Sequence, residues 1–217
     1  MPDRGSPNWP SRLELGVAER ALAGEYRSGD RAVLVAYEGG ALVAAIDGLG
    51  HGSGAAEASA VAADVLTAHP DDEPAHLLDA CHAAMSRTRG AVMTLAWFDL
   101  AEGRLSWTGV GNVEGRLVHA GAAAAMPTEG ALTRGGVVGY NLPSIRVTST
   151  DLLAGDVIVL ATDGIDSRFG EAIVRGGSAQ DIADRILADH GKQGDDALVV
   201  VVRYLGGVEC RSTLERP

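Results

Sequence analysis

The sequence predicts an α+β fold in which two antiparallel β-sheets stack face to face with helices on the outside. The apolar, β-branched runs come mostly in pairs joined by short turns, as at 32–37 and 41–46 around Glu38-Gly39-Gly40. The helical patterns are grouped and do not alternate one by one with the strands, which disfavours a doubly wound parallel sheet. The run 157–161 is continuously apolar, which is typical of a buried strand.

The elements follow in order along the chain. Strands are expected at 13–22, 32–37, 41–46, 92–99, 104–109, 113–119, 145–150, 156–161 and 197–204. Helices are expected at 52–68, 75–87 and 178–190, because apolar side chains recur there with the period of a helix. No internal repeat interrupts this order.

Composition indicates one globular domain with a sizeable core, since 46% of the 217 residues are hydrophobic and 22% are charged. We expect this domain at 12–205, with a disordered lead at 1–11 and a flexible tail at 206–217. The 18 Lys and Arg against 29 Asp and Glu give a net charge of −11. This charge argues against nucleic acid as a partner, because neutralising phosphates requires basic clusters.

Membrane insertion, secretion and thiol chemistry are also disfavoured. No apolar run approaches the ~18–20 residues of a membrane span, and residues 1–10 lack the apolar core of a signal peptide. Cys81 and Cys210 form no CxxC pattern, so no zinc or redox motif is expected. A reducing cytoplasm fits these observations best.

Four aspartates carry the main functional signal. Asp47 and Asp163 follow apolar strands and precede glycines, while Asp30 and Asp195 precede strands. Each has an ordinary explanation by itself: a turn for Asp30 and Asp47, a helix cap for Asp163 and a solvated loop for Asp195. Other carboxylates, such as Asp64, fit solvated helix faces. Because all four stand at strand ends, one shared rim would gather them into a cage for hard divalent cations.

Two neighbours of these aspartates add to the pattern. Gly48 lets the carbonyl after Asp47 face a ligand with no Cβ in the way, so that a carboxylate and a carbonyl can bind two cations side by side. Asp195 and Asp196 repel each other unless a cation or exposure relieves them. We interpret Asp196 as a neighbour that tunes Asp195 or caps the last strand, and not as a further ligand.

The ordered set of motifs resembles a known family, the PPM (PP2C-like) metal-dependent serine/threonine phosphatases, and within it the SpoIIE-type branch. The similar motifs are Ser28-Gly29-Asp30, Asp47-Gly48-Leu49-Gly50-His51-Gly52, Ala161-Thr162-Asp163-Gly164 and Asp195-Asp196. Three further segments resemble the stand-alone RsbX-type phosphatases of the stressosome pathway: Arg89-Gly90-Ala91, Gly111-Asn112-Val113 and Gly139-Tyr140-x-Leu142-Pro143. The resemblance spans about 23–205 and implies the α-β-β-α sandwich of that family.

The resemblance also implies roles at the site. Asp47 would bridge two Mn²⁺ or Mg²⁺ ions, and Gly48 would offer its carbonyl to one of them. Asp163 and Asp195 would complete the first ion, and Asp30 would help the second, directly or through water. A water activated by both cations would then attack phosphorus in line. Asp47, Asp163 and Asp195 are the catalytic residues in this reading.

For some residues near these motifs, two interpretations of their role remain. His51 could act as a general acid, since it titrates in the right range, or pack on the helix start, which we favour. Arg89 could touch substrate or end a helix, and we favour the structural role. Gly111-Asn112 is read as a turn between strands. No arginine near the N-terminal strands is obviously placed to hold the phosphate.

The implied function is hydrolysis of phosphoserine or phosphothreonine on a STAS-domain regulator. The expected partner is a stressosome protein of the RsbR or RsbS kind or an anti-sigma-factor antagonist. A first alternative is a catalytically silent PPM-like binding module that docks through its acidic rim. A second is a different two-metal hydrolase of small phosphoesters, which would need a basic and aromatic pocket, whereas only 4% of residues are aromatic.

Overall fold

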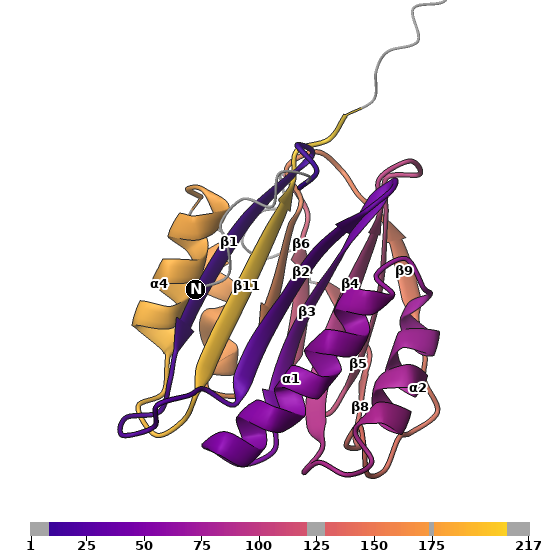
Figure 1. Cartoon of the computed structure of the whole chain (residues 1–217). Helices are drawn as coiled ribbons and strands as arrows, with labels where there is room; N and C mark the ends of the chain where they lie inside the picture. The colour runs from indigo at the N-terminus through magenta and orange to yellow at the C-terminus, as the bar shows by residue number, and fades with distance from the viewer. Residues whose placement is uncertain (1–8, 121–128, 174–175, 208–217) are drawn as a thin grey trace, which may run out of the picture.

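The computed structural model describes residues 9–120, 129–173 and 176–207 as two β-sheets packed face to face, with helices on both outer faces (Figure 1). The first sheet runs in the order β1 (Leu13–Arg20), β11 (Ala197–Tyr204), β10 (Val157–Ala161), β6 (Glu114–Val118) and β7 (Glu129–Gly130). The second runs β2 (Asp30–Tyr37), β3 (Gly40–Gly48), β4 (Ala91–Asp99), β5 (Arg104–Val110) and β8 (Thr133–Arg134). A further strand, β9 (Thr148–Asp151), also pairs with β5.

Almost every pairing is antiparallel, and only β5 and β8 run parallel among the described strands. The predicted hairpin is present, because Tyr37 of β2 pairs with Gly40 of β3. Gly39 between them has a φ of 86°, a left-handed conformation that glycine adopts without strain. The turn chemistry of the sequence therefore sets the register of these two central strands.

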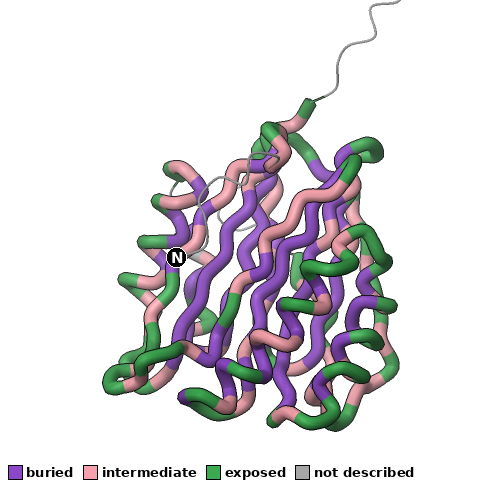
Figure 2. Tube along the Cα trace, in the orientation of Figure 1, coloured by how far each residue is buried: buried purple, intermediate pink, exposed green. Residues whose placement is uncertain are grey.

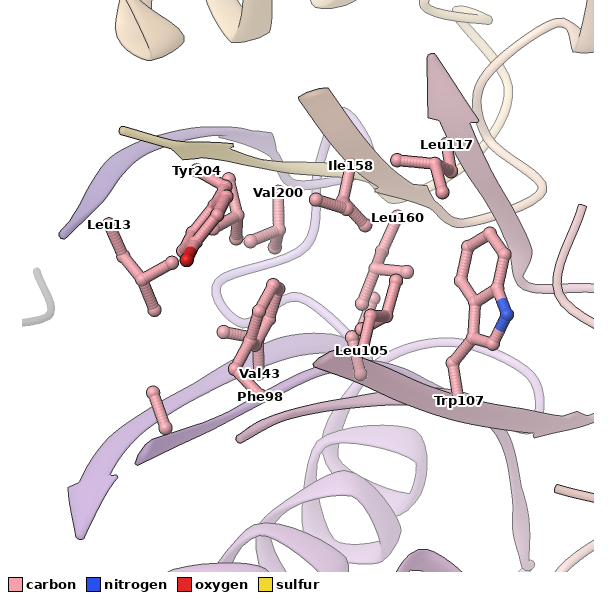
Figure 3. Close-up of a cluster of buried hydrophobic side chains, with 14 of the residues drawn as sticks. Leu13, Val43, Phe98, Leu105, Trp107, Leu117, Ile158, Leu160, Val200 and Tyr204 are labelled. Carbon is pink, nitrogen blue, oxygen red and sulfur yellow. The ribbon is translucent and has the colours of Figure 1, made fainter. Parts of the chain in front are cut away.

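The core between the sheets is built from side chains that point inward from both of them (Figure 3). Val43, Phe98 and Trp107 come from the second sheet, and Ile158 and Val200 face them from the first. All five are at most 2% exposed, so this apolar layer holds the two sheets together. The central strands β3, β4, β10 and β11 are buried over most of their length (Figure 2).

Helices cover the outer face of each sheet and close two further apolar layers. On the second sheet lie α1 (Ser53–Ala68) and α2 (Pro74–Ala84). On the first sheet lie the 3₁₀ turn η1 (Ser167–Phe169), α3 (Gly170–Ile173) and α4 (Ala179–His190). The predicted α-β-β-α arrangement is thus confirmed.

Short or polar elements account for most differences from the prediction. The strands β7 and β8 have two residues each, too few to leave a periodic pattern. The second helix ends at Ala84, earlier than the expected 87, and a turn follows in which Thr88 donates from its amide to the Met85 carbonyl. The pair η1 and α3 is absent from the expected helices, and only the alternative of a helix cap at Asp163 implied a short helical segment there. Helix α4 matches closely because Ser178 forms a capping box with Asp181.

No helix in the described part of the chain is long and apolar enough to cross a membrane. The described residues exclude most of the predicted lead, the tail from 208 onward, residues 121–125 and Cys210. Within the described part, the indole of Trp9 packs against the core and donates to the Leu13 carbonyl. The domain limits 12–205 stay a prediction.

Candidate metal centre at the strand ends

The four predicted aspartates lie at one end of the sandwich. Asp30 begins β2 and stands directly opposite Asp47 near the end of β3. Asp163 lies two residues after β10, and Asp195 lies two residues before β11. Because β10 and β11 are antiparallel neighbours, the end of one meets the start of the other. Both sheets therefore contribute two aspartates each to the same end of the fold.

The electrostatics show that these carboxylates are close enough to repel one another. Burial, together with the charges of Asp163, Asp195 and Asp196, raises the pKa of Asp47 to about 7. Burial likewise raises the pKa of Asp30 to about 8, although a hydrogen bond from Thr162 opposes the rise. The pKa of Asp195 is raised too, by burial and then by the charge of Asp163. A cluster of this kind favours a nearby cation.

Asp30 is held in place by a residue of the opposite sheet. The Thr162 hydroxyl donates to Asp30 Oδ2 at 2.7 Å, and the same hydroxyl accepts from the Leu198 amide at 2.9 Å. Asp30 is only 8% exposed. Its position at the end of β2 is thus tied to the ends of β10 and β11.

Glycines at this end are required by close packing. A Cβ on Gly48 would lie 2.1 Å from the Ala55 carbonyl oxygen in the first turn of α1, and a Cβ on Gly164 would lie 1.8 Å from the Asp196 carbonyl oxygen. Such distances exclude any side chain. Two reasons therefore favour a glycine at position 48. The sequence predicts that it gives a ligand access to its carbonyl, and the structure shows that it allows the close approach of α1.

Asp196 has a structural role that the sequence did not reveal. Its carboxylate accepts from the Leu22 amide at 2.7 Å and from the Gly29 amide at 2.8 Å, and the residue is 3% exposed. These bonds fix the loop between β1 and β2 directly before Asp30. Asp196 therefore shapes the site by positioning a loop, in addition to donating its own amide to Asp195 at 2.9 Å.

Asp163 has two partners that sequence reasoning missed. The Asn112 side-chain amide donates to Asp163 Oδ2 at 2.8 Å, and the Lys192 ammonium donates to the Asp163 carbonyl. Gly111 has a φ of 93°, as expected for the predicted turn. The Gly111-Asn112 motif was the only feature of the sequence that could have indicated the contact between Asn112 and Asp163. The alternative of a helix cap at Asp163 is wrong, because Asp166 accepts from the Arg168 amide and caps η1.

Asn112 also borders a cavity of about 500 Å³ between β6, β7 and β8. The cavity is lined by Asn112, Val113, Glu114, Gly115, Arg116, Gly130, Ala131 and Thr133. Arg116 is engaged there, since its guanidinium pairs with Glu114 and lies 4.5 Å from the Phe169 ring centre. The hollow thus opens next to Asp163 and has mainly polar walls.

His51 contacts the loop between β1 and β2. Its Nδ1 lies 2.9 Å from Glu25 Oε1, and its side chain is 68% exposed. A histidine that is paired with a surface glutamate matches the favoured reading of a loop histidine near the start of α1.

The donor groups at this end fit hard divalent cations, because all of them are oxygens. No Lys or Arg side chain in the described part of the chain forms an ion pair with Asp30, Asp47, Asp163 or Asp195. Across residues 9–120, 129–173 and 176–207, no three Asp, Glu, His or Cys side chains already converge as a complete ligand set. Backbone carbonyls and waters would therefore complete the coordination, as the role of Gly48 requires.

The chain has the fold of the PPM (PP2C-like) class of serine/threonine phosphatase domains, in which two β-sheets pack between helices. Its aspartates gather at the strand ends. The chain belongs to the SpoIIE family, since the family described as Stage II sporulation protein E (SpoIIE) matches residues 37–205. The resemblance inferred from the motifs is confirmed. No curated protein matches the chain.

Solved structures agree with this class. A protein from work on the bacterial stressosome, a modular system adapted to control secondary messenger signaling, is 28% identical with a TM-score of 0.80, covering 88% of this chain and 99% of its own. RsbX in complex with magnesium is 20% identical with a TM-score of 0.80, covering 89% and 96%. The Mycobacterium tuberculosis serine/threonine phosphatase PstP/Ppp is 21% identical with a TM-score of 0.67, covering 90% and 99%.

Proposed function

We propose that this domain is a metal-dependent protein phosphatase that hydrolyses phosphoserine or phosphothreonine on a STAS-domain regulator. The observation that carries the proposal is the gathering of Asp30, Asp47, Asp163 and Asp195 from four strand ends of two sheets. The likeness to a protein from work on the bacterial stressosome supports the substrate class, because it agrees with the resemblance of the motifs to the phosphatases of that pathway.

The resemblance to the PPM phosphatases suggests the ligand roles. Asp47 would contact both cations, with the Gly48 carbonyl on one of them. Asp163 and Asp195 would complete the first ion, and Asp30 would reach the second, directly or through water. When bound, two divalent cations would lower the pKa of a water and offset charge on the phosphoryl oxygens.

The surrounding residues keep this set in place. Asn112 and Lys192 hold the side chain and the backbone of Asp163 from two sides. Thr162 orients Asp30 so that one carboxylate oxygen is engaged in a hydrogen bond. These contacts reduce the reorganisation needed when substrate binds, and such outer contacts commonly alter metal affinity or activity by about 10–100-fold.

A covalent cysteine route is not supported by the position of Cys81. This thiol is fully buried among α1, α2 and the second sheet, and burial raises its pKa to about 12. A thiol in that state is a poor nucleophile. Direct attack by water, the route in this proposal, needs no cysteine.

The test is hydrolysis of a phosphorylated STAS-domain protein during titration with Mn²⁺ or Mg²⁺, with EDTA as the metal-free control. We expect Asp47→Asn to reduce turnover by more than about 100-fold while the protein stays folded, since loss of a direct ligand should exceed the loss of an outer contact. Asp64→Asn, an exposed change on α1, is the matched control. Full turnover by Asp47→Asn would refute the metal role, and an inactive wild type would favour a silent binding module.

A further inference from the structure

Arg89 lies next to the candidate metal centre, although the sequence favoured a structural role for it. After α2 the chain turns at Thr88, whose hydroxyl accepts from the Gly90 amide, and then enters β4. The Leu49 amide donates to the Gly90 carbonyl at 3.0 Å, and Ala91 pairs with Gly48. The segment that carries Arg89 is therefore bound directly to the residues that follow Asp47.

The Arg89 side chain packs against two glycines. A Cβ on Gly54, in the first turn of α1, would lie 2.6 Å from Arg89 Nε and 2.8 Å from its Cζ. A Cβ on Gly50 would lie 3.1 Å from Nη1 of the same guanidinium. Because Gly50 and Gly54 have no side chains, the guanidinium can pack closely against the loop between β3 and α1.

The guanidinium has its charge available for a ligand. Arg89 is exposed, and no carboxylate in the described part of the chain forms an ion pair with it. The N-cap of α1 is Gly52, which gives no side-chain hydrogen bond to the first amides, and no acidic residue occupies the first turn. The positive end of this helix adds to the potential around Arg89, although the Glu25 carboxylate beside Gly52 offsets part of it.

We propose that Arg89 binds the phosphoryl oxygens of the substrate at the metal centre, an inference that rests on the proposed phosphatase function. A guanidinium presents several N–H donors in a rigid plane and can hold two phosphoryl oxygens at once. The four aspartates can attract cations but cannot donate hydrogen bonds to a dianion. Arg89 supplies such a donor from the α1 side of the site.

The rival for this role is Arg27, which is also exposed and lies in the loop between β1 and β2, three residues before Asp30. No described contact places its side chain over the strand ends, whereas the side chain of Arg89 lies close to Gly50 and Gly54. A purely structural Arg89 would instead brace the glycine loop without affecting phosphate binding. The experiment must separate these three possibilities.

The test measures the affinity of the Mg²⁺-loaded protein for inorganic phosphate by calorimetry and the KM for p-nitrophenyl phosphate. We expect Arg89→Ala to weaken phosphate binding and raise KM by about tenfold or more, because hydrogen bonds to charged groups contribute on this scale. Arg89→Lys should recover part of the affinity, since it keeps the charge but loses the planar donor pair. Arg87→Ala, an exposed change in the same turn, should leave both values unchanged.

Contrary outcomes are distinguishable. If Arg89→Ala lowers the melting temperature but leaves phosphate affinity and KM at wild-type values, the role is structural and the inference is overturned. If Arg27→Ala alone weakens phosphate binding, the site belongs to Arg27. If the wild type shows no metal-dependent hydrolysis, the proposed function itself fails and this inference falls with it.

Discussion

The hydroxyl of Thr162 donates a 2.7 Å hydrogen bond to the carboxylate of Asp30, and the two residues belong to different sheets. Thr162 follows β10 in the first sheet, and Asp30 begins β2 in the second. The separation of the sheets therefore controls where Asp30 stands relative to Asp163. Packing of the apolar core and geometry of the candidate metal centre are coupled through this one contact.

Thr162→Val should test that coupling. The change keeps the shape of the side chain but removes the donor to Asp30 and the acceptor for the Leu198 amide, both buried. We expect a loss of about 1–3 kcal/mol of stability and weaker Mn²⁺ binding, measured by urea unfolding and calorimetry. Thr108→Val, which removes a hydrogen bond to the Arg146 carbonyl, should affect stability alone. Equal Mn²⁺ affinity in both variants would contradict the proposed link.

Asn112→Ala should reduce metal affinity or turnover by about 10–100-fold, as expected for loss of a group that orients a ligand. The reason is that Asn112 holds Asp163 Oδ2 through its side-chain amide. The measurement is a Mn²⁺ titration of phosphatase activity. Asn141→Ala, an exposed change, serves as the control, and identical titration curves for all three proteins would show that Asn112 is only a turn residue.

Divalent cations should stabilise the fold. Without a cation, burial and then mutual repulsion disfavour the charged carboxylates and raise the pKa values of Asp30 and Asp47. A cation that binds only the folded state adds about 2.7 kcal/mol at 100 times its dissociation constant. We expect Mn²⁺ to raise the melting temperature and EDTA to lower it, with a much smaller shift in Asp47→Asn. An unchanged melting temperature in the wild type at saturating Mn²⁺ would argue against a metal centre.

The opposite end of the sandwich should give a pH-dependent contribution from His119. Burial lowers its pKa, but hydrogen bonds and charge from Asp156 and Glu129 outweigh burial and leave the pKa raised. A raised pKa means that this stabilisation is fully present below the unfolded value near 6.5 and is lost as pH rises through the folded value.

Urea unfolding of wild type and His119→Gln between pH 5.5 and 8.5 measures that contribution. We expect the stability difference between the two proteins to be largest at pH 5.5 and to shrink toward pH 8.5. A stability difference that grows with pH would mean that folding lowers the pKa of His119. It would exclude an ion pair between His119 and the buried Asp156.

Much of the fold follows from the sequence, because the periodic patterns are strong where the elements are long. The last strand was expected at 197–204, which are the bounds of β11, and its continuous apolar pattern matches burial on both faces. The short β7 and β8 could not be predicted, since two residues carry no period. Their pairing depends on neighbouring strands that are distant along the chain.

The candidate site was likewise predictable from the sequence only in part. The sequence by itself determined that Asp30, Asp47, Asp163 and Asp195 stand at strand ends beside glycines, because local patterns mark where strands begin and stop. Only the tertiary structure decided that Asn112 reaches Asp163, that Asp196 holds the loop before Asp30, and that Arg89 lies across Gly54. These contacts join residues far apart in sequence, so their distances are set by how the sheets and helices pack and not by any local pattern.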